Sequence, residues 1–179
     1  MKPNMKLWIA EQMKNLMKTK SIDKIRVTDI CKAAEIERST FYYHFQDKYE
    51  LVAWIFCYSF WNTDVLNLKS STETMEKMRK DYIFYKRAFE DNSQNPLWKY
   101  LVEFFVRRYE LEAKKKLNTD ILDTQLIYSI RLYCHGAVGM TREWILDDNK
   151  ADASTIVEMM FKSMPKNMTF LLPFSDDTM

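Results

Sequence analysis

The scarcity of glycine limits the folds that this chain can adopt. The 179 residues include 2 glycines, Gly136 and Gly139, both inside an apolar stretch, whereas average usage of roughly 7% would give about a dozen. Phosphate-binding loops, dinucleotide-binding turns and tight hairpins use glycine for positive φ or for close approach of the backbone. The composition therefore argues against nucleotide-binding α/β folds and all-β folds, and it predicts an all-α protein.

The charges are unevenly distributed along the chain. Residues 1–50 contain ten Lys or Arg and seven Asp or Glu, an excess of +3, whereas the other 129 contain seventeen and eighteen, a balance of −1. We therefore expect any anion-binding surface to lie near the N-terminus.

The cysteines and the apolar runs indicate the compartment. Cys31, Cys57 and Cys134 form no Cys-x-x-Cys pair, which favours reduced thiols over a disulfide framework. The longest nearly unbroken apolar run, 51–61, is shorter than the span of about 20 residues that crosses a membrane. The Lys-rich N-terminus lacks an apolar signal core. We expect a cytoplasmic protein with no membrane partner.

Hydrophobic spacing predicts helices throughout the chain. In the first 50 residues it predicts a helix over 6–18, a short helix over about 27–35, and a third that opens at Arg38 or Ser39 and turns Phe41 and Phe45 inward. Asp47 is the predicted N-cap of a fourth helix. The remaining predicted helices cover 48–66, 72–91, 96–116 with proline in its first turn, 120–147, and a last one from Asp152 to Met164. A tail that docks loosely or frays follows from Lys166.

Three short helices within about 40 residues have the proportions of a helix-turn-helix module. The third helix crowds hydrogen-bond donors into seven positions, and such a face suits phosphates and base edges in a major groove. The alternative is a tyrosine-rich amphipathic helix with a solvated polar face. The donors are Arg38, Ser39, Thr40, Tyr42, Tyr43 and His44.

The run 38–51, Arg-Ser-Thr-Phe-Tyr-Tyr-His-Phe-Gln-Asp-Lys-Tyr-Glu-Leu, resembles the end of the TetR-family DNA-binding domain. That family has Thr, an apolar residue, Tyr, any residue, His, Phe and then Lys. The run 27–34 resembles the family's second helix, and the resemblance covers roughly residues 5 to 55. It implies a sequence-specific transcriptional regulator that binds a near-palindromic double-stranded DNA operator as a homodimer. The segment 133–165 is similar to the branch that includes regulators of dihydroxyacetone kinase operons.

The resemblance also implies roles for individual residues. Thr28 is expected to touch the DNA backbone near the start of the second helix, and Lys48 to touch it again after the third. Arg38, Ser39 and Thr40 are expected at the positive end of the recognition helix. Arg38 is the candidate for direct readout of guanine. Tyr42, Tyr43 and His44 are expected to contact phosphate or base edges.

Two positions depart from the family pattern. Glu35 stands where the family has a glycine in the turn, so we expect a non-glycine residue at positive φ, at a cost of about 1 to 2 kcal/mol. Arg26 stands where the family has a threonine cap. Alternatively the second helix starts later with Thr28 as its cap, and Thr28 then has no DNA role.

The resemblance implies an N-terminal DNA-binding domain, 1–50, and a helical C-terminal domain, 51–179, that makes the dimer and often holds a ligand pocket. Its aromatic residues suit a pocket for a small-molecule effector, with core packing as the alternative, and a protein effector is also possible in this branch. The candidate pocket residues are Tyr85, Trp98, Phe105, Tyr128 and His135. The last two helices carry apolar stripes that predict a four-helix dimer interface, with packing on the subunit's own core as the alternative. The stripes comprise Val138, Trp144, Ile145, Ile156, Met160, Phe161 and Met164.

Catalysis has little support in the sequence. Cys134 and His135 are adjacent, and neighbours on a helix diverge by about 100°, so they cannot form a nucleophile and base pair. With two histidines in all, a metal site lacks imidazole ligands. We expect no enzyme activity, no cofactor and no metal. We expect a repressor released by an effector; the alternatives are an activator and a helical interaction protein that does not bind DNA.

Overall fold

The structure is a computed structural model that describes residues 4–90, 97–148 and 150–173. Every regular element within these ranges is a helix, which confirms the all-α prediction. The elements are α1 (Met5–Met17), η1 (Ile22–Lys24), α2 (Val27–Ala34), α3 (Arg38–His44), α4 (Lys48–Ser59), α5 (Leu68–Lys80), α6 (Tyr82–Glu90), α7 (Leu97–Leu117), α8 (Thr124–Leu146), α9 (Ala153–Lys162) and η2 (Lys166–Leu171). No helix in the described ranges is both long enough and apolar enough to cross a membrane.

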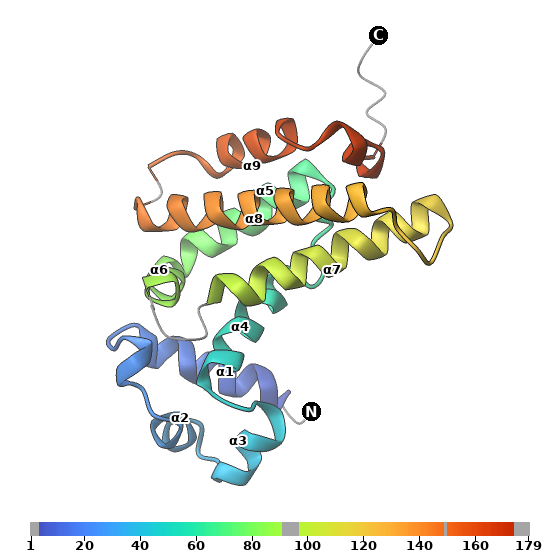
Figure 1. Ribbon diagram of the computed structural model, residues 1–179. Coiled ribbons are helices and arrows are strands. Elements are labelled where there is room, and N and C mark those ends of the chain that lie inside the picture. Colours follow the sequence, from blue (N-terminus) through green and yellow to red (C-terminus); the bar gives the residue numbers. More distant parts are fainter. Residues whose placement is uncertain (1–3, 91–96, 149, 174–179) are drawn as a thin grey trace.

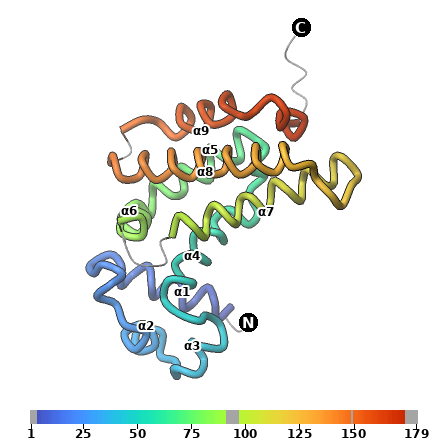
Figure 2. Tube along the Cα trace, in the orientation of Figure 1, coloured from blue at the N-terminus to red at the C-terminus, as the bar shows by residue number. Residues whose placement is uncertain are grey.

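The helices form a small N-terminal unit below a larger C-terminal body (Figure 1). Helices α1, α2 and α3 make the lower unit, and α4 runs upward from it toward the body, as the trace in Figure 2 also shows. In the body, α8 packs along α7 and also contacts α6 and α9, while α5 packs against α9. The helix pair α2 and α3 therefore lies at the end of the molecule farthest from α9.

The N-terminal unit folds around one apolar core. Helix α1 begins after Asn4, whose side-chain oxygen accepts a hydrogen bond from the Lys6 backbone N–H at 3.1 Å. The face of α1 that carries Ile9, Met13 and Met17 is buried, and it packs in the same apolar cluster as side chains from α2 and α3. The fully buried members of this core are Ile9, Met13, Met17, Ile25, Ile30 and Phe41.

Some helix boundaries differ from those predicted. Helix α4 ends at Ser59, well before residue 66, and Asn67 caps the next helix by accepting from the Ser70 backbone N–H at 2.9 Å. The predicted helix 72–91 is two helices, because Asp81 leaves the helical conformation at φ −101° and ψ 27°. The last α-helix ends at Lys162, before Met164. The predicted proline in the first turn of 96–116 lies outside the described residues.

The segment after α9 docks more tightly than predicted, as far as residue 172. Met168 and Leu171 are fully buried. The Lys116 ammonium donates to the backbone carbonyls of Phe170, Leu171 and Leu172 at 3.1, 2.8 and 3.4 Å. The end of η2 is therefore attached to the end of α7.

Charged side chains join the N-terminal helices to the body. Lys14 of α1 forms an ion pair with Asp81 at the α5–α6 junction. Arg87 of α6 donates to the backbone carbonyls of Met17, at 2.5 Å, and Lys20, at 3.3 Å, just beyond α1. Cations at a helix C-terminus are favourable because unpaired carbonyls there carry partial negative charge.

Arg108 of α7 makes the equivalent contact at the end of α4. Its guanidinium donates to the Phe60 carbonyl at 2.5 Å and to the Thr63 carbonyl at 2.7 Å. The helix that carries the N-terminal unit is thereby attached to the body at its upper end.

Candidate functional site

The turn between α2 and α3 depends on one residue with a left-handed backbone. Glu35 has φ 55° and ψ 45°, and the Ile36 N–H donates to the Cys31 carbonyl at 3.0 Å, as in helix ends closed by a left-handed residue. The prediction of positive φ at Glu35 is confirmed. The Trp8 indole N–H donates to the Ala34 carbonyl at 2.9 Å, which provides a hydrogen-bond partner for the last carbonyl of α2.

Helix α2 begins at Val27, so the alternative in which Thr28 caps a later helix is wrong. Arg26 has extended backbone, and its backbone N–H donates to the Asp29 carboxylate at 2.9 Å. An arginine side chain has no acceptor to offer in return, so this helix start is only half capped. Thr28 is the second residue of the helix and is exposed.

Helix α3 separates its apolar residues from its hydrogen-bond donors. Phe41 and Phe45 are buried in the N-terminal core, as predicted. Tyr43 is 85% exposed and Tyr42 is 48% exposed, and the Arg38 guanidinium carbon lies 5.8 Å from the centre of the Tyr42 ring. Ser39 is also exposed, and Thr40 and His44 are half-buried. The structure therefore brings these donors together on one short helix, at the end of the molecule away from the body (Figure 1).

Lys48 faces inward. Its ammonium donates to the carbonyls of Ile22, Asp23 and Ile25 at 2.7, 3.1 and 2.8 Å. An ammonium group has three N–H donors, and these three carbonyls can accept all of them. Lys48 thus fixes the chain between α1 and α2. This role was not predictable from the sequence, because the partners are more than 20 residues away.

The five predicted pocket residues do not come together. Phe105 lines a cavity in the body. Tyr85 is buried on α6, where its hydroxyl lies 2.8 Å from the Ser59 hydroxyl, and burial raises its pKa to about 12. Trp98, Tyr128 and His135 are exposed, and the rings of Trp98 and His135 lie 6.4 Å apart on the surface.

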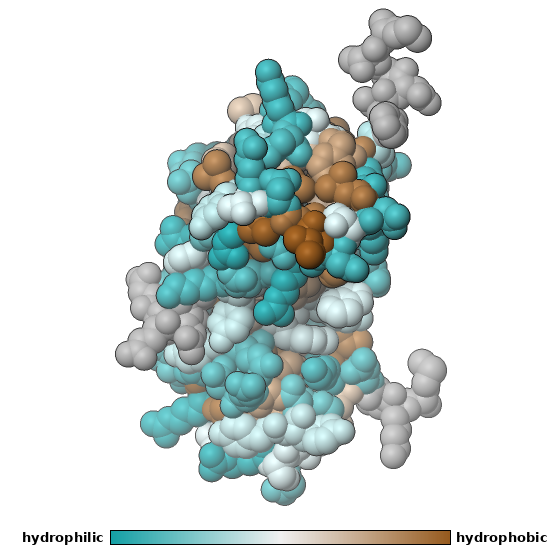
Figure 3. Space-filling view, turned by 45° about the vertical axis from the view of Figure 1, so that its right-hand side comes forward, coloured by the Kyte–Doolittle hydropathy of each residue, from teal (hydrophilic) through white to brown (hydrophobic). Residues whose placement is uncertain are grey.

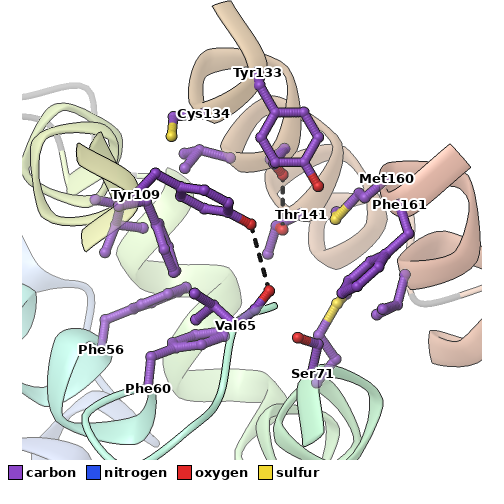
Figure 4. A pocket seen from close by; sticks show the side chains of 16 residues that line it. Phe56, Phe60, Val65, Ser71, Tyr109, Tyr133, Cys134, Thr141, Met160 and Phe161 are labelled. Atoms are coloured by element: carbon purple, nitrogen blue, oxygen red, sulfur yellow. Dashed lines mark hydrogen bonds between the residues drawn. The ribbon is translucent and has the colours of Figure 1, made fainter. Parts of the chain in front are cut away.

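The cavity has a volume of about 70 Å³ and lies where α4, α5, α7, α8 and α9 meet. Figure 4 shows the hydroxyls of Tyr109 and Tyr133 turned toward the cavity, with Thr141 and Phe161 also at its wall. Sequence reasoning missed these residues, because buried aromatic residues at helical spacing look the same whether they fill a core or surround a cavity. Further lining residues are Phe56, Phe60, Ser71, Met75, Cys134 and Met160.

Most residues of the predicted dimer stripes are buried within the subunit itself and are not free to contact a second copy. Four of the seven residues are buried in its own core: Val138, Trp144, Ile145 and Met164. The other three, Ile156, Met160 and Phe161, are half-buried, and the last two also line the cavity.

A different face of α8 and α9 is open to solvent. Tyr128, Leu132 and Met140 are 69%, 72% and 40% exposed, and Met159 of α9 is 53% exposed. Gly136 and Gly139 lie on the same face of α8, and a Cβ atom at either position would meet no atom within 4 Å. Figure 3 shows hydrophobic side chains on the surface of the C-terminal body, in patches between hydrophilic ones.

Two family models match the chain. Residues 11–55 match the model described as bacterial regulatory proteins, tetR family, and residues 68–166 match one described as a transcriptional regulator C-terminal region. A curated relative, the HTH-type dhaKLM operon transcriptional activator DhaS of Lactococcus lactis subsp. lactis, is 27% identical over 173 residues, covering 85% of this chain and 86% of that protein. A solved structure, the dihydroxyacetone kinase operon activator DhaS, superposes with a TM-score of 0.63 at 20% identity, covering 95% of this chain and 99% of that one.

Proposed function

The chain belongs to the tetR family of bacterial regulatory proteins, and we propose that it controls transcription by inserting α3 into the major groove of a DNA operator. The observation that carries this proposal is the donor-rich face of α3, held outward by buried Phe41 and Phe45. In this proposal residues 1–50 read the DNA, and residues 51–179 form the regulatory and dimerisation domain. We propose no enzymatic role for the protein. We place it in the cytoplasm, where a bacterial regulator binds its DNA.

The proposed reader is built around Arg38. A guanidinium that pairs bidentately with guanine discriminates between bases by about 1 to 3 kcal/mol. Its position over the Tyr42 ring supports this role, because the ring restricts the side chain at the protein surface before DNA arrives. The remaining proposed contacts to phosphate or base edges are Thr28, Ser39, Thr40, Tyr42, Tyr43 and His44.

We propose a different role for Lys48 from the one expected. Because its ammonium is engaged by three carbonyls, Lys48 acts as a positioning residue that holds the chain before α2. Its contribution to DNA binding is then indirect.

The open face of α8 and α9 supports a homodimer. Glycine within a helix costs roughly 0.5 to 1 kcal/mol relative to alanine, and nothing inside the subunit requires glycine at 136 or 139. Close approach of a second helix provides a reason for both, because the distance between packed helices depends on the side chains at their contact. Two copies joined there present two α3 helices to successive major grooves, about 34 to 36 Å apart, on a near-palindromic operator.

We propose that an effector acts through the cavity. Its walls include Phe56 of α4, which carries the DNA-binding unit, and Met160 of α9, on the proposed dimer side. An occupant that binds one arrangement of these helices better than another shifts the population between them. A small-molecule effector fits the cavity, whereas a protein effector would act from the surface.

The protein can act on transcription in one of two ways, as a repressor or as an activator. In the first, the protein is a repressor that the effector releases from DNA. In the second, the protein is an activator. The two relatives favour this role, because each is named as the activator of an operon. A promoter fusion carrying the selected operator separates them, since deleting the regulator raises expression in the first case and lowers it in the second.

The first experiment is selection of bound duplexes from a random DNA pool by the purified protein at physiological salt. We expect a near-palindrome whose affinity falls steeply as salt rises. Arg38→Ala combined with Tyr43→Ala should abolish the sequence preference, whereas Arg107→Ala, an exposed arginine on α7, should preserve it. A folded dimer that enriches no sequence contradicts the proposal and favours the helical interaction protein.

A test of the interface uses sedimentation. Gly136→Leu with Gly139→Leu should shift the protein toward monomer, and Lys69→Leu, which adds an exposed leucine on α5, should not. An unchanged dimer in the double variant contradicts the proposed face.

A further inference from the structure

The cavity in the C-terminal body is free of formal charge. None of the side chains that line it belongs to Asp, Glu, Lys, Arg or His. Burial raises the pKa of Tyr133 and of Cys134 to about 12, so both stay neutral at physiological pH. A charged ligand would lose its hydration here without gaining an opposite charge, which is very costly.

The size of the cavity limits its occupant. Its volume of about 70 Å³ is enough for more than one water molecule. It is about half of the roughly 150 Å³ that accommodates benzene in an engineered protein cavity. The space therefore suits a molecule of about three to five non-hydrogen atoms.

Polar groups at the wall are few and grouped. Figure 4 shows the hydroxyls of Tyr109 and Tyr133 facing the same space, and the two rings lie 5.5 Å apart. The Tyr109 hydroxyl donates to the Val65 carbonyl at a long 3.4 Å, and the Thr141 hydroxyl donates to the Ala137 carbonyl at 2.9 Å. Each hydroxyl oxygen retains acceptor capacity, so one polar group of a ligand can be satisfied there. The Ser71 hydroxyl of α5 also lies at the wall, and the other lining side chains are apolar apart from the Cys134 thiol.

From these features we propose that the cavity binds a compact, uncharged and mostly apolar molecule with a single hydroxyl or carbonyl group, of the class of short-chain alcohols and ketones. This inference rests on the effector role in the proposed function and names the class of effector. It excludes organic phosphates and carboxylates, because their charges have no partner at the wall, and it disfavours polyols, because most of the wall is apolar. So few atoms limit the dissociation constant to the micromolar range or weaker.

Methionine methyl NMR tests the proposal directly. Met75 and Met160 line the cavity, whereas Met13 lies in the N-terminal core and reports on the fold. We expect 2-butanone to shift the Met75 and Met160 signals saturably and to leave Met13 unchanged. Propionate, which adds a charge, and 1,2-propanediol, which adds a hydroxyl, have the same number of non-hydrogen atoms as 2-butanone and should give no saturable shift at the same concentrations. Equal responses to all three probes, or no response to butanone, overturn the proposal.

Cavity-filling variants provide the control. Ala137→Leu and, separately, Ser71→Met place extra atoms in the space and should abolish the butanone shifts while the Met13 signal stays native. If either variant fails to fold, the other still decides. Butanone shifts that persist in a folded variant contradict the proposed location.

Operator binding, measured on the same samples, separates this inference from the proposed function. Sequence-specific DNA binding without methyl shifts overturns only the cavity ligand. Methyl shifts in a protein with no preferred sequence overturn only the DNA-binding proposal.

Discussion

Replacing Glu35 by glycine is predicted to stabilise the protein. Glu35 adopts φ 55° in the turn before α3, where an L-residue with a Cβ atom costs about 1 to 2 kcal/mol. Glycine removes that cost but adds roughly 0.5 to 1 kcal/mol of unfolded-state entropy. The Glu35 side chain is exposed, so its loss opens no cavity. The expected net gain is about 0.5 to 1 kcal/mol, or a Tm rise of roughly 1 to 4 °C for a chain of this size.

Thermal unfolding at one fixed protein concentration measures this gain, because a dimer's Tm depends on concentration. Glu35→Ala is the matched control, since it removes the same carboxylate but keeps the Cβ atom. Alanine should therefore give no comparable rise. Both variants should bind operator DNA more tightly at low salt, because each removes a negative charge beside α3. Equal Tm values for the glycine and alanine variants would refute the backbone argument.

Three further predictions concern other contacts in the structure. Lys48→Met should lower the free energy of unfolding by about 1.5 to 3 kcal/mol without changing the salt dependence of DNA binding; a flatter dependence would indicate a phosphate contact. Arg108→Ala should weaken operator binding while α3 stays intact, because it frees two carbonyls beyond α4; unchanged affinity contradicts this. Burial raises the pKa of Cys134 and Tyr133 in the folded protein to about 12. The stabilisation that comes from burying these groups in their neutral form is therefore present below their unfolded-state pKa values and is lost as the pH rises toward 12. A urea unfolding midpoint that stays constant from pH 8 to 11 would contradict this predicted loss of stability.

The N-terminal unit was largely predictable because its information is local. The four-residue spacing of Phe41 and Phe45 predicted the buried side of α3, whereas the left-handed turn at Glu35 was predicted from the family resemblance, because the family has a glycine at this position. Thr28 illustrates the limit: two starts for α2 agreed with the sequence, and the structure chooses the earlier.

The C-terminal body was less predictable because its features depend on packing. The apolar run continues to Trp61 before the turn-forming residues Asn62, Thr63 and Asp64, so the sequence signal for the end of α4 lies just beyond Ser59. Asp81 breaks a helix that its neighbours favour. Tyr109 and Tyr133 have the spacing of ordinary core residues. The contacts of Arg108 join residues more than 40 positions apart, which periodicity does not detect.

The attachment of α4 at its upper end gives the molecule a mechanical property. With 12 residues and a rise of about 1.5 Å per residue, α4 is a rod about 18 Å long. If Arg108 and the cavity wall act as its pivot, a tilt of about 10° moves the far end, where α3 attaches, by about 3 Å. In a two-fold dimer the rotation axis relates the two displacements, so they add. The distance between the two recognition helices then changes by up to about 6 Å, compared with about 34 Å between successive major grooves. At a rise of about 3.4 Å per base pair, such a change in spacing would amount to a mismatch of almost two base pairs at the DNA.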